Sequence, residues 1–185
     1  PLSAPGNGRY HLFAVTTFSE GAAPKLRVLS YSPYRVWNWA SIEGPVADNT
    51  CFTDSNSSVA CVGASTENWE VVPASRFSNL TQTHWRRSTR DNTGNPDNKV
   101  DYDGLFELYA VNDRLCGSGS ATQINGSGNR FAGTNSCTND YYLTQFDGQI
   151  TIDTAGTYQF AVDGDDGVEV TINGTVVASW YGGHD

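Results

Sequence analysis

The stretch TYQFAVDGDDGVEVTINGTVV, residues 157–177, indicates β-strands and a tight hairpin, and so sets the fold class. In Tyr158–Val162 and Val168–Ile172, apolar and polar side chains alternate with the two-residue period that is typical of a half-buried strand. The dipeptide Asn173-Gly174 follows directly and favours a two-residue turn into the next apolar run. The stretch therefore predicts β-strands, two of them joined by a hairpin.

The same strand signal recurs along the chain. Two runs near the N-terminus, RYHLFAVTTF and KLRVLSYS, flank the turn residues SEGAAP and predict a second hairpin. Gly104–Val111 and Phe146–Ile152 predict two more strands. No window shows a helical period with capping residues, so the expected fold class is all-β, a sandwich or a barrel.

The composition favours one acidic domain. The chain has 185 residues, 38% of them hydrophobic, which is enough for a single domain with its own core. Acidic residues number 20 against 11 lysines and arginines, so neither nucleic acid nor an anionic membrane surface is an expected partner, and no membrane insertion is expected either. No apolar run approaches the roughly 18 residues that span a bilayer. Because the chain begins at Pro1 and contains no methionine, we expect a mature or excised segment.

The four cysteines form two local pairs, Cys51 with Cys61 and Cys116 with Cys137, in loops rich in Ser, Asn, Gly and Thr. None lies in a C-x-x-C pattern, so a zinc site is poorly supported. Disulfides are favoured over buried thiols because the neighbours are polar. Three pairings are possible, and loop closure favours the near ones, each worth about 2–3 kcal/mol. Disulfides indicate an oxidising, extracytoplasmic compartment.

An acidic turn lies between the two alternating strands of the opening stretch. Asp163, Asp165 and Asp166 occupy three of four consecutive positions, and Gly167 closes the group. A Ca²⁺ ion would hold these like charges together, since it takes 6–8 oxygen ligands and tolerates irregular loops. The alternative is a solvated acidic turn.

The order of motifs from Phe146 to Trp180 resembles the PA-14 (protective-antigen) domain family. In that family a strand is followed by G-x-Y-x-F, a strand, D-D-G, and a hairpin that ends near a tryptophan. The resemblance implies a β-sandwich in which the adjacent aspartates share a cis peptide, bind Ca²⁺ and, through the ion, hold a glycan. The matching positions here are Gly156, Tyr158, Phe160, Asp165, Asp166, Gly167, Asn173, Gly174 and Trp180.

The motifs are circularly shifted relative to that family. Gly104, Leu105 and Tyr109 resemble the family's opening strand, whereas its closing strands resemble segments near the N-terminus. The expected fold is therefore a PA-14-like β-sandwich with permuted or strand-exchanged connectivity and disulfide-bearing loops. Its expected segments are the closing strands at 1–35, a disulfide-bearing insertion and trailing segment at 36–82, an acidic and polar linker at 83–103, and the opening strands with the D-D-G core at 104–185.

This order leaves open how the sheet is completed. A chain that ends with an incomplete sheet would expose unpaired strand edges, which soluble proteins avoid. We expect residues from about Gly8 to Ser32 to pair with the one sheet that contains both Tyr158–Val162 and Val168–Ile172. The pairing is predicted between successive units, as strand complementation in a head-to-tail polymer. A permuted monomer and one period of a long tandem array are the alternatives.

Two further sets of residues are candidate ligand sites. Asp97, Asp101 and Asp103 are spaced as in a calcium loop and predict a second metal site, with a solvated linker as the alternative. Trp180 and His184 are candidates for contact with a bound ligand.

No enzymatic motif is present, so a non-enzymatic function is expected. His11, His84 and His184 are isolated from one another in the sequence. Two functions remain: the repeating unit of an extracellular, calcium-stabilised surface filament or long adhesin, and a lectin-like adhesion domain whose Ca²⁺ binds cell-surface glycans. Both place the protein outside the cell.

Overall fold

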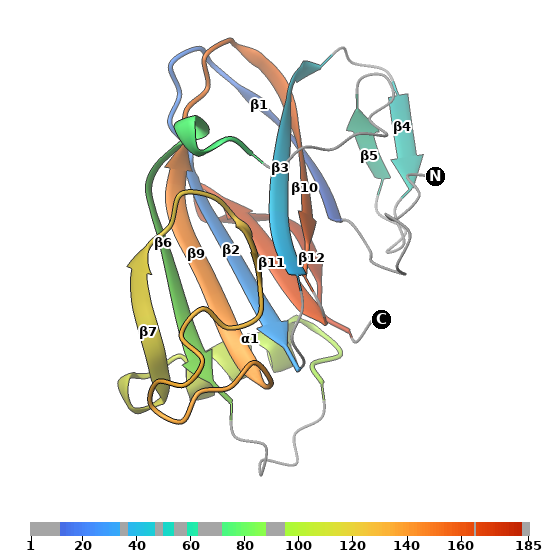
Figure 1. Cartoon of the computed structure of the whole chain (residues 1–185). Coiled ribbons are helices and arrows are strands. Elements are labelled where there is room, and N and C mark those ends of the chain that lie inside the picture. The colour runs from blue at the N-terminus through green and yellow to red at the C-terminus, as the bar shows by residue number, and fades with distance from the viewer. Residues whose placement is uncertain are drawn as a thin grey trace.

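The computed structural model describes residues 12–33, 37–46, 50–53, 59–62, 72–87, 95–164 and 166–182. Within these residues the strands form two larger antiparallel sheets and one separate hairpin (Figure 1). The all-β sandwich expected from the sequence is confirmed. The four-stranded sheet has the order β1 (Leu12–Phe18), β10 (Gly156–Asp163), β3 (Trp37–Val46) and β8 (Asn125–Ser127). The six-stranded sheet has the order β12 (Thr175–Trp180), β11 (Gly167–Ile172), β2 (Lys25–Ser32), β9 (Tyr142–Ile150), β6 (Phe77–Arg86) and β7 (Leu115–Ser120).

The smaller elements lie outside these two sheets. The separate hairpin pairs β4 (Thr50–Thr53) with β5 (Val59–Val62). Two short 3-10 helices precede strands of the six-stranded sheet: η1 (Ala74–Arg76) leads into β6, and η2 (Asn112–Arg114) leads into β7.

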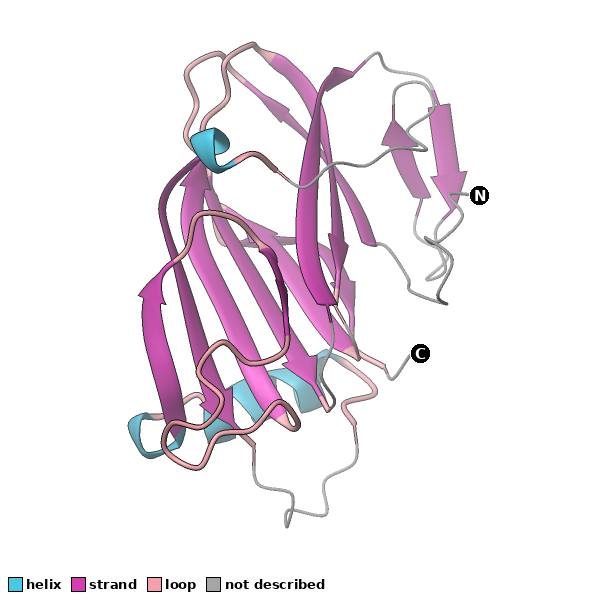
Figure 2. Cartoon of the chain, in the orientation of Figure 1, coloured by secondary structure: helices cyan, strands magenta, loops and turns pink. Residues whose placement is uncertain are grey.

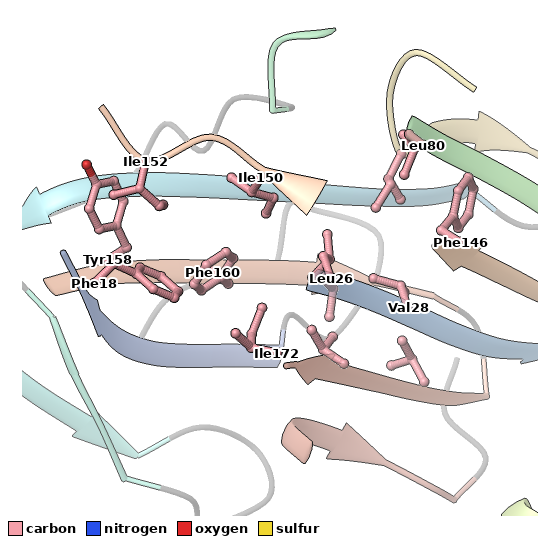
Figure 3. Close-up of a cluster of buried hydrophobic side chains, with 14 residues drawn as sticks. Phe18, Leu26, Val28, Leu80, Phe146, Ile150, Ile152, Tyr158, Phe160 and Ile172 are labelled. Atoms are coloured by element: carbon pink, nitrogen blue, oxygen red, sulfur yellow. The ribbon is translucent and has the colours of Figure 1, made fainter. Parts of the chain in front are cut away.

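The main core fills the space between the two sheets (Figure 3). Alternation along β2 sends Leu26 and Val28 into this core, as the two-residue period predicts. The aromatic rings of Phe18 and Tyr158 lie 5.9 Å apart, and they join β1 to its neighbour β10. Each large apolar side chain buried in this way contributes about 1.5–3 kcal/mol, so the sandwich depends on strands from both ends of the chain.

The predicted hairpin near the N-terminus is wrong, because its two strands belong to different sheets. β1 pairs with β10 in the four-stranded sheet, and β2 lies between β11 and β9 in the six-stranded sheet. The connection between them pairs instead with residues after β9: the Gly21 amide donates to the Ile152 carbonyl oxygen at 2.9 Å, and the Ile152 amide donates to that of Ala22 at 3.0 Å. These bonds attach the connection to the segment after β9, so it crosses from one sheet to the other and does not form a tight turn.

The N-terminal strands pair with both predicted segments, and these pairings lie within one chain. The single sheet expected to contain both segments is wrong, because β10 and β11 belong to different sheets. β1 runs antiparallel to β10 with Leu12 opposite Val162, and β2 runs antiparallel to β11 with Leu26 opposite Ile172. Residues 8–11 lie outside the described part of the chain. The structure of the single chain therefore corresponds to the closed monomer, which was the alternative to pairing between units.

The strand predicted at Gly104–Val111 is wrong, since these residues belong largely to helix α1 (Lys99–Tyr109). The side chain of Asn98 caps the helix by accepting from the amides of Val100 and Asp101 at 2.9 and 3.1 Å. Helical spacing then buries Tyr102, Leu105 and Tyr109 on one face. The segment 83–103, which was expected to be a linker, thus contributes the end of β6 and the start of α1.

Helix α1 covers part of the six-stranded sheet on the face turned away from the main core (Figure 2). Tyr31 and Leu143 come from this face of β2 and β9, and they form a second buried cluster with the apolar face of the helix. The sheet is therefore buried on both faces at this end. A helix was not foreseen here because the alternating run GLFELYAV fits a strand as well as a helix.

A disulfide joins Cys116 to Cys137, with 5.7 Å between their Cα atoms, which confirms the prediction for this pair. Cys51 and Cys61 are register partners in the β4–β5 hairpin, but their side chains lie outside the described part, so their bond stays a prediction. None of the helices in the described residues has the length and apolar character needed to cross a bilayer.

Candidate functional site

The acidic turn connects the end of β10 to the start of β11, at one end of the sandwich. Asp166 is 4% exposed and its backbone has a φ of 55°, a left-handed conformation that is uncommon for residues other than glycine. The structure describes only the backbone of Asp163, and Asp165 lies outside the described residues. Of the three aspartates predicted to bind calcium, Asp166 is therefore the one whose side chain the structure describes.

A buried tyrosine and a buried arginine lie beside this turn. The Arg87 guanidinium lies 4.8 Å from the ring centroid of Tyr31, and both residues are buried. Burial raises the pKa of Tyr31 to about 12; the positive charge of Arg87 opposes this rise, and the negative charge of Asp166 adds to it. Asp166 and Arg87 thus both act on Tyr31, so the acidic turn has a buried cation in its surroundings.

Helix α1 closes over the same turn. A Cβ atom at Gly167 would lie 2.5 Å from the ring of Tyr102, a distance that side chains do not tolerate. The same atom would lie 3.7 Å from the ring of Pro96, just before the helix. The glycine of the D-D-G sequence is therefore required by the approach of α1, because any side chain there would displace Tyr102.

A buried glutamate fixes the helix to strand β11. Glu169 is 5% exposed and accepts from Lys99 Nζ at 2.9 Å and from Tyr181 Oη at 2.7 Å. Hydrogen bonds to Asp103 and then to Glu169 raise the pKa of Lys99, so the lysine stays charged. Burial, and after it the negative charge of Glu169, holds the pKa of Tyr102 well above its usual range. These contacts tie the first turn of α1 to the strand that begins at the acidic turn.

The second metal site stays a prediction, and its three aspartates do not form a cluster in the described part of the chain. Asp101 accepts from the Asn98 side-chain amide at 2.7 Å, and Asp103 pairs with Lys99 at 2.9 Å. Asp97 is exposed ahead of the helix. Among the described residues, no three His, Cys, Asp or Glu side chains lie close enough together to hold a metal ion. Asp101 and Asp103 instead stabilise the N-terminal turns of α1.

The structure describes one of the two residues that were predicted to contact a ligand. Trp180 Nε1 donates to the carbonyl oxygen of Gly182 at 2.7 Å, and its ring packs against the main core. His184 lies outside the described residues. Trp180 therefore has a structural role in the described part of the chain, and a role in ligand binding stays a prediction.

Most of the residues around the turn could not be predicted from the sequence. Tyr31, Arg87 and Glu169 carry no motif, and only the fold brings them together. Helix α1 did leave a signal: Asn98 is followed three residues later by Asp101, a pattern close to a capping box, and apolar residues follow at helical spacing. That signal would have predicted the helix and placed Tyr102 on its buried face.

Comparison with known proteins agrees with this architecture. Residues 101–179 match the PA14 domain family. The match confirms the resemblance seen in the sequence. It runs from the first turn of α1 into β12, so the matched segment contains the D-D-G turn and all but the first two residues of the helix over it. β1, β2 and β3 precede that segment.

One curated relative extends this comparison. The type IV pilus biogenesis factor PilY1 homolog of Xylella fastidiosa strain Temecula1 is 42% identical over 120 residues. The aligned region is 62% of this chain and 8% of the relative, so the chain corresponds to a small part of that protein. No solved structure matches the chain.

Proposed function

We propose that this chain is a non-enzymatic, calcium-binding adhesion module of an extracellular, pilus-associated protein. The observation that carries the proposal is the D-D-G turn at the end of the sandwich, where Asp166 is buried in a left-handed conformation under helix α1. The PA14 match supports an adhesin-like module, and the relative named as a pilus biogenesis factor supports a surface location.

The donor chemistry of the turn suits Ca²⁺. Carboxylate oxygens are the ligands that this ion prefers, and Asp163, Asp165 and Asp166 supply up to six of them in four consecutive positions. Burying an ionised carboxylate such as that of Asp166 is costly unless a cation is close. Arg87 brings one positive charge to the surroundings, which leaves the turn acidic. A calcium ion held by these aspartates would balance the remaining charge and offer open coordination positions to hydroxyl groups of a glycan.

A closed unit is favoured over a strand-exchanged filament. β1 and β2 already occupy the places beside β10 and β11 within their own chain, so these places need no strand from a neighbour. The filament repeat therefore becomes the second candidate, with head-to-tail contacts made elsewhere on the surface. Sedimentation of the purified chain over a wide concentration range separates the two: a monomer throughout supports the closed module, and growing oligomers support the filament.

The surroundings of the titratable groups support a binding role over catalysis. Of the three histidines, the structure describes His84, which is fully buried, and burial lowers its pKa to about 3. A histidine in this state neither meets a substrate nor exchanges protons near neutral pH. Glu169 is likewise engaged with Lys99 and Tyr181 in holding the helix.

The calcium proposal is tested by titration calorimetry with CaCl₂ on the chain and on Asp166→Asn. Asp153→Asn is the matched control, because it removes the same charge from an exposed carboxylate that pairs with Arg76. We expect binding in the wild type and the control and none in Asp166→Asn. Equal heats of binding in all three proteins would contradict a calcium site at this turn.

The adhesion proposal is tested separately, with the labelled chain on a glycan array in calcium and in EDTA. Binding to glycans in calcium that is lost in EDTA supports a lectin-like module. Calcium binding in the calorimeter without any glycan signal would leave the metal structural and contradict the glycan-binding part of the proposal.

A further inference from the structure

The outer face of helix α1 carries exposed apolar side chains that the fold does not use. Among the described residues, four large hydrophobic side chains are exposed, and three of them lie on α1 or directly after it. Val100 is 79% exposed, Leu108 is 59% exposed, and Val111 follows the helix. Val100 and Leu108 are eight residues apart, a little over two helical turns, so they lie on the same side of the helix. Concentrated apolar exposure of this kind is typical of a surface that binds another protein.

The exposure does not arise from loose attachment of the helix. Tyr102, Leu105 and Tyr109 are buried on the opposite face against the six-stranded sheet. Lys99 fixes the first turn to Glu169, and Asn98 caps the N-terminus. The helix is thus held on its inner side, and its outer face is presented in a defined orientation.

A groove follows this outer face. It has a volume of ≈ 500 Å³ and lies between the segment Asn95–Asp97 and the helix, with Val100, Gly104 and Leu108 along it. The volume is in the range of sites that take a few side chains of a partner.

Gly104 makes the middle of this groove hollow. A Cβ atom at this position would meet nothing within 4 Å, so no packing contact requires a glycine. Glycine in an exposed helix interior costs roughly 1 kcal/mol relative to alanine. The residue is therefore unfavourable for the helix itself. Its lack of a side chain allows a bound partner to approach the helix backbone between Val100 and Leu108.

The rim of the groove is acidic. Asp97 and Asp101 line it, Asp97 has no ion pair among the described residues, and the chain as a whole has a net charge of −9. A like-charged copy of this chain is a poor occupant, because its approach would be repelled. We infer that the α1 groove binds a segment of a partner protein that presents apolar side chains flanked by lysine or arginine. The groove is lined by Asn95–Asp97, Val100, Asp101, Gly104, Leu105 and Leu108.

The experiment uses an amphipathic Leu/Lys peptide as the probe, with leucines at helical spacing. Two control peptides accompany it: one with every lysine replaced by glutamate, and one with the Leu/Lys composition scrambled so that no apolar face forms. Binding is measured by fluorescence anisotropy, and the site is mapped from amide chemical shifts. We expect the Leu/Lys peptide to bind with shifts confined to residues 95–111, and both controls to bind at least roughly tenfold more weakly.

Variants of the chain distinguish the groove from general attraction to an acidic protein. Val100→Ser with Leu108→Ser should weaken binding roughly tenfold, whereas Val176→Ser, at an exposed valine on β12, should not. Gly104→Gln should weaken binding while the melting temperature stays equal or rises, because glutamine favours a helix but fills the groove. Asp97→Asn should weaken binding and reduce its dependence on salt.

Three outcomes would overturn the inference. These are equal binding of the amphipathic and scrambled peptides, binding that is unaffected by both the double serine variant and Gly104→Gln, and absence of binding to the wild type. Self-association of the chain with shifts at residues 95–111 would make a second copy the occupant and also contradict it. None of these outcomes depends on calcium, so the result stands apart from the proposed metal site.

Discussion

The ring of Tyr102 occupies the space that a side chain at Gly167 would need, with 2.5 Å between a Cβ built at that glycine and the nearest ring atom. This contact joins helix α1 to the first residue of β11. We expect Gly167→Ala to destabilise the chain by about 1–3 kcal/mol, because the ring must shift within a packed cluster. Urea unfolding measures the change, and Gly126→Ala is the control, since a Cβ there meets nothing within 4 Å. Equal effects of the two substitutions would contradict the required contact.

Removal of the Tyr102 hydroxyl is expected not to destabilise the protein. It is fully buried and has no hydrogen-bond partner among the described residues. A buried polar group without a partner costs about 1–3 kcal/mol, so Tyr102→Phe should leave the stability unchanged or raise it. Tyr158→Phe is the control, because the Tyr158 hydroxyl donates to the Thr154 carbonyl oxygen at 2.8 Å and its removal should lower the free energy of unfolding. A large loss of stability in Tyr102→Phe alone would show that the hydroxyl is satisfied.

The ion pair between Lys99 and the buried Glu169 should contribute more to the free energy of unfolding than an exposed pair does. Lys99→Met leaves the buried Glu169 carboxylate with the Tyr181 hydroxyl as its remaining hydrogen-bond partner among the described residues, and we expect a loss of about 2–3 kcal/mol in the free energy of unfolding. Arg27→Met is the control, since its pair with Asp147 is 50% and 37% exposed and should contribute at most about 1 kcal/mol. Chemical denaturation of both variants compares the two pairs, and a larger loss for Arg27→Met would reverse the ranking.

The buried histidine predicts a loss of stability in acid. Burial lowers the pKa of His84 to about 3, below its ordinary value of 6.5, so between these values the unfolded chain binds a proton that the folded chain does not. Its contribution is complete above about pH 6.5 and is lost as the pH falls toward 3. We expect roughly 3 kcal/mol less stability at pH 4 than at pH 7 from this residue alone. Carboxylates titrate in the same range, so the test compares urea unfolding of the wild type with that of His84→Gln. Identical pH profiles would contradict the assignment.

The disulfide between Cys116 and Cys137 should stabilise the chain by constraining its unfolded state. The two residues are 21 positions apart, and a loop of this length predicts a loss of about 3 kcal/mol for the double alanine variant. Peptide mapping without reduction checks this bond and the predicted Cys51–Cys61 bond in one experiment. A crossed pairing would contradict both local assignments.

Calcium should raise the melting temperature if the acidic turn binds it only in the folded state. An ion at a hundred times its dissociation constant adds about 2.7 kcal/mol. We expect EDTA to remove this increment from the wild type and from Asp153→Asn, and to have no effect on Asp166→Asn. The same melt in calcium and in EDTA for the wild type would leave the turn as a solvated acidic loop.

The C-terminal strands and one disulfide could be predicted from sequence because their signals are local. Asn173 and Gly174 have positive φ values of 51° and 82°, as the two-residue turn of the predicted hairpin requires. The assignment of β1 and β2 to different sheets could not be predicted, because alternation shows that a strand has a buried face but not which sheet contains it. The proximity of Tyr31, Arg87 and Asp166 depends on three segments far apart in the sequence, and no local pattern encodes it.

The pairing of Leu12 with Val162 has a consequence for how the protein is made. Each of the two larger sheets contains strands from the beginning and from the end of the chain, so neither can be completed before β10 and β11 have emerged from the ribosome or from an export channel. Contacts of such long sequence separation make folding slow. The first strands therefore stay unfolded until the last ones are available. A translocation channel accepts a polypeptide in this unfolded form. A chaperone that shields these strands during that interval should raise the yield of the native protein.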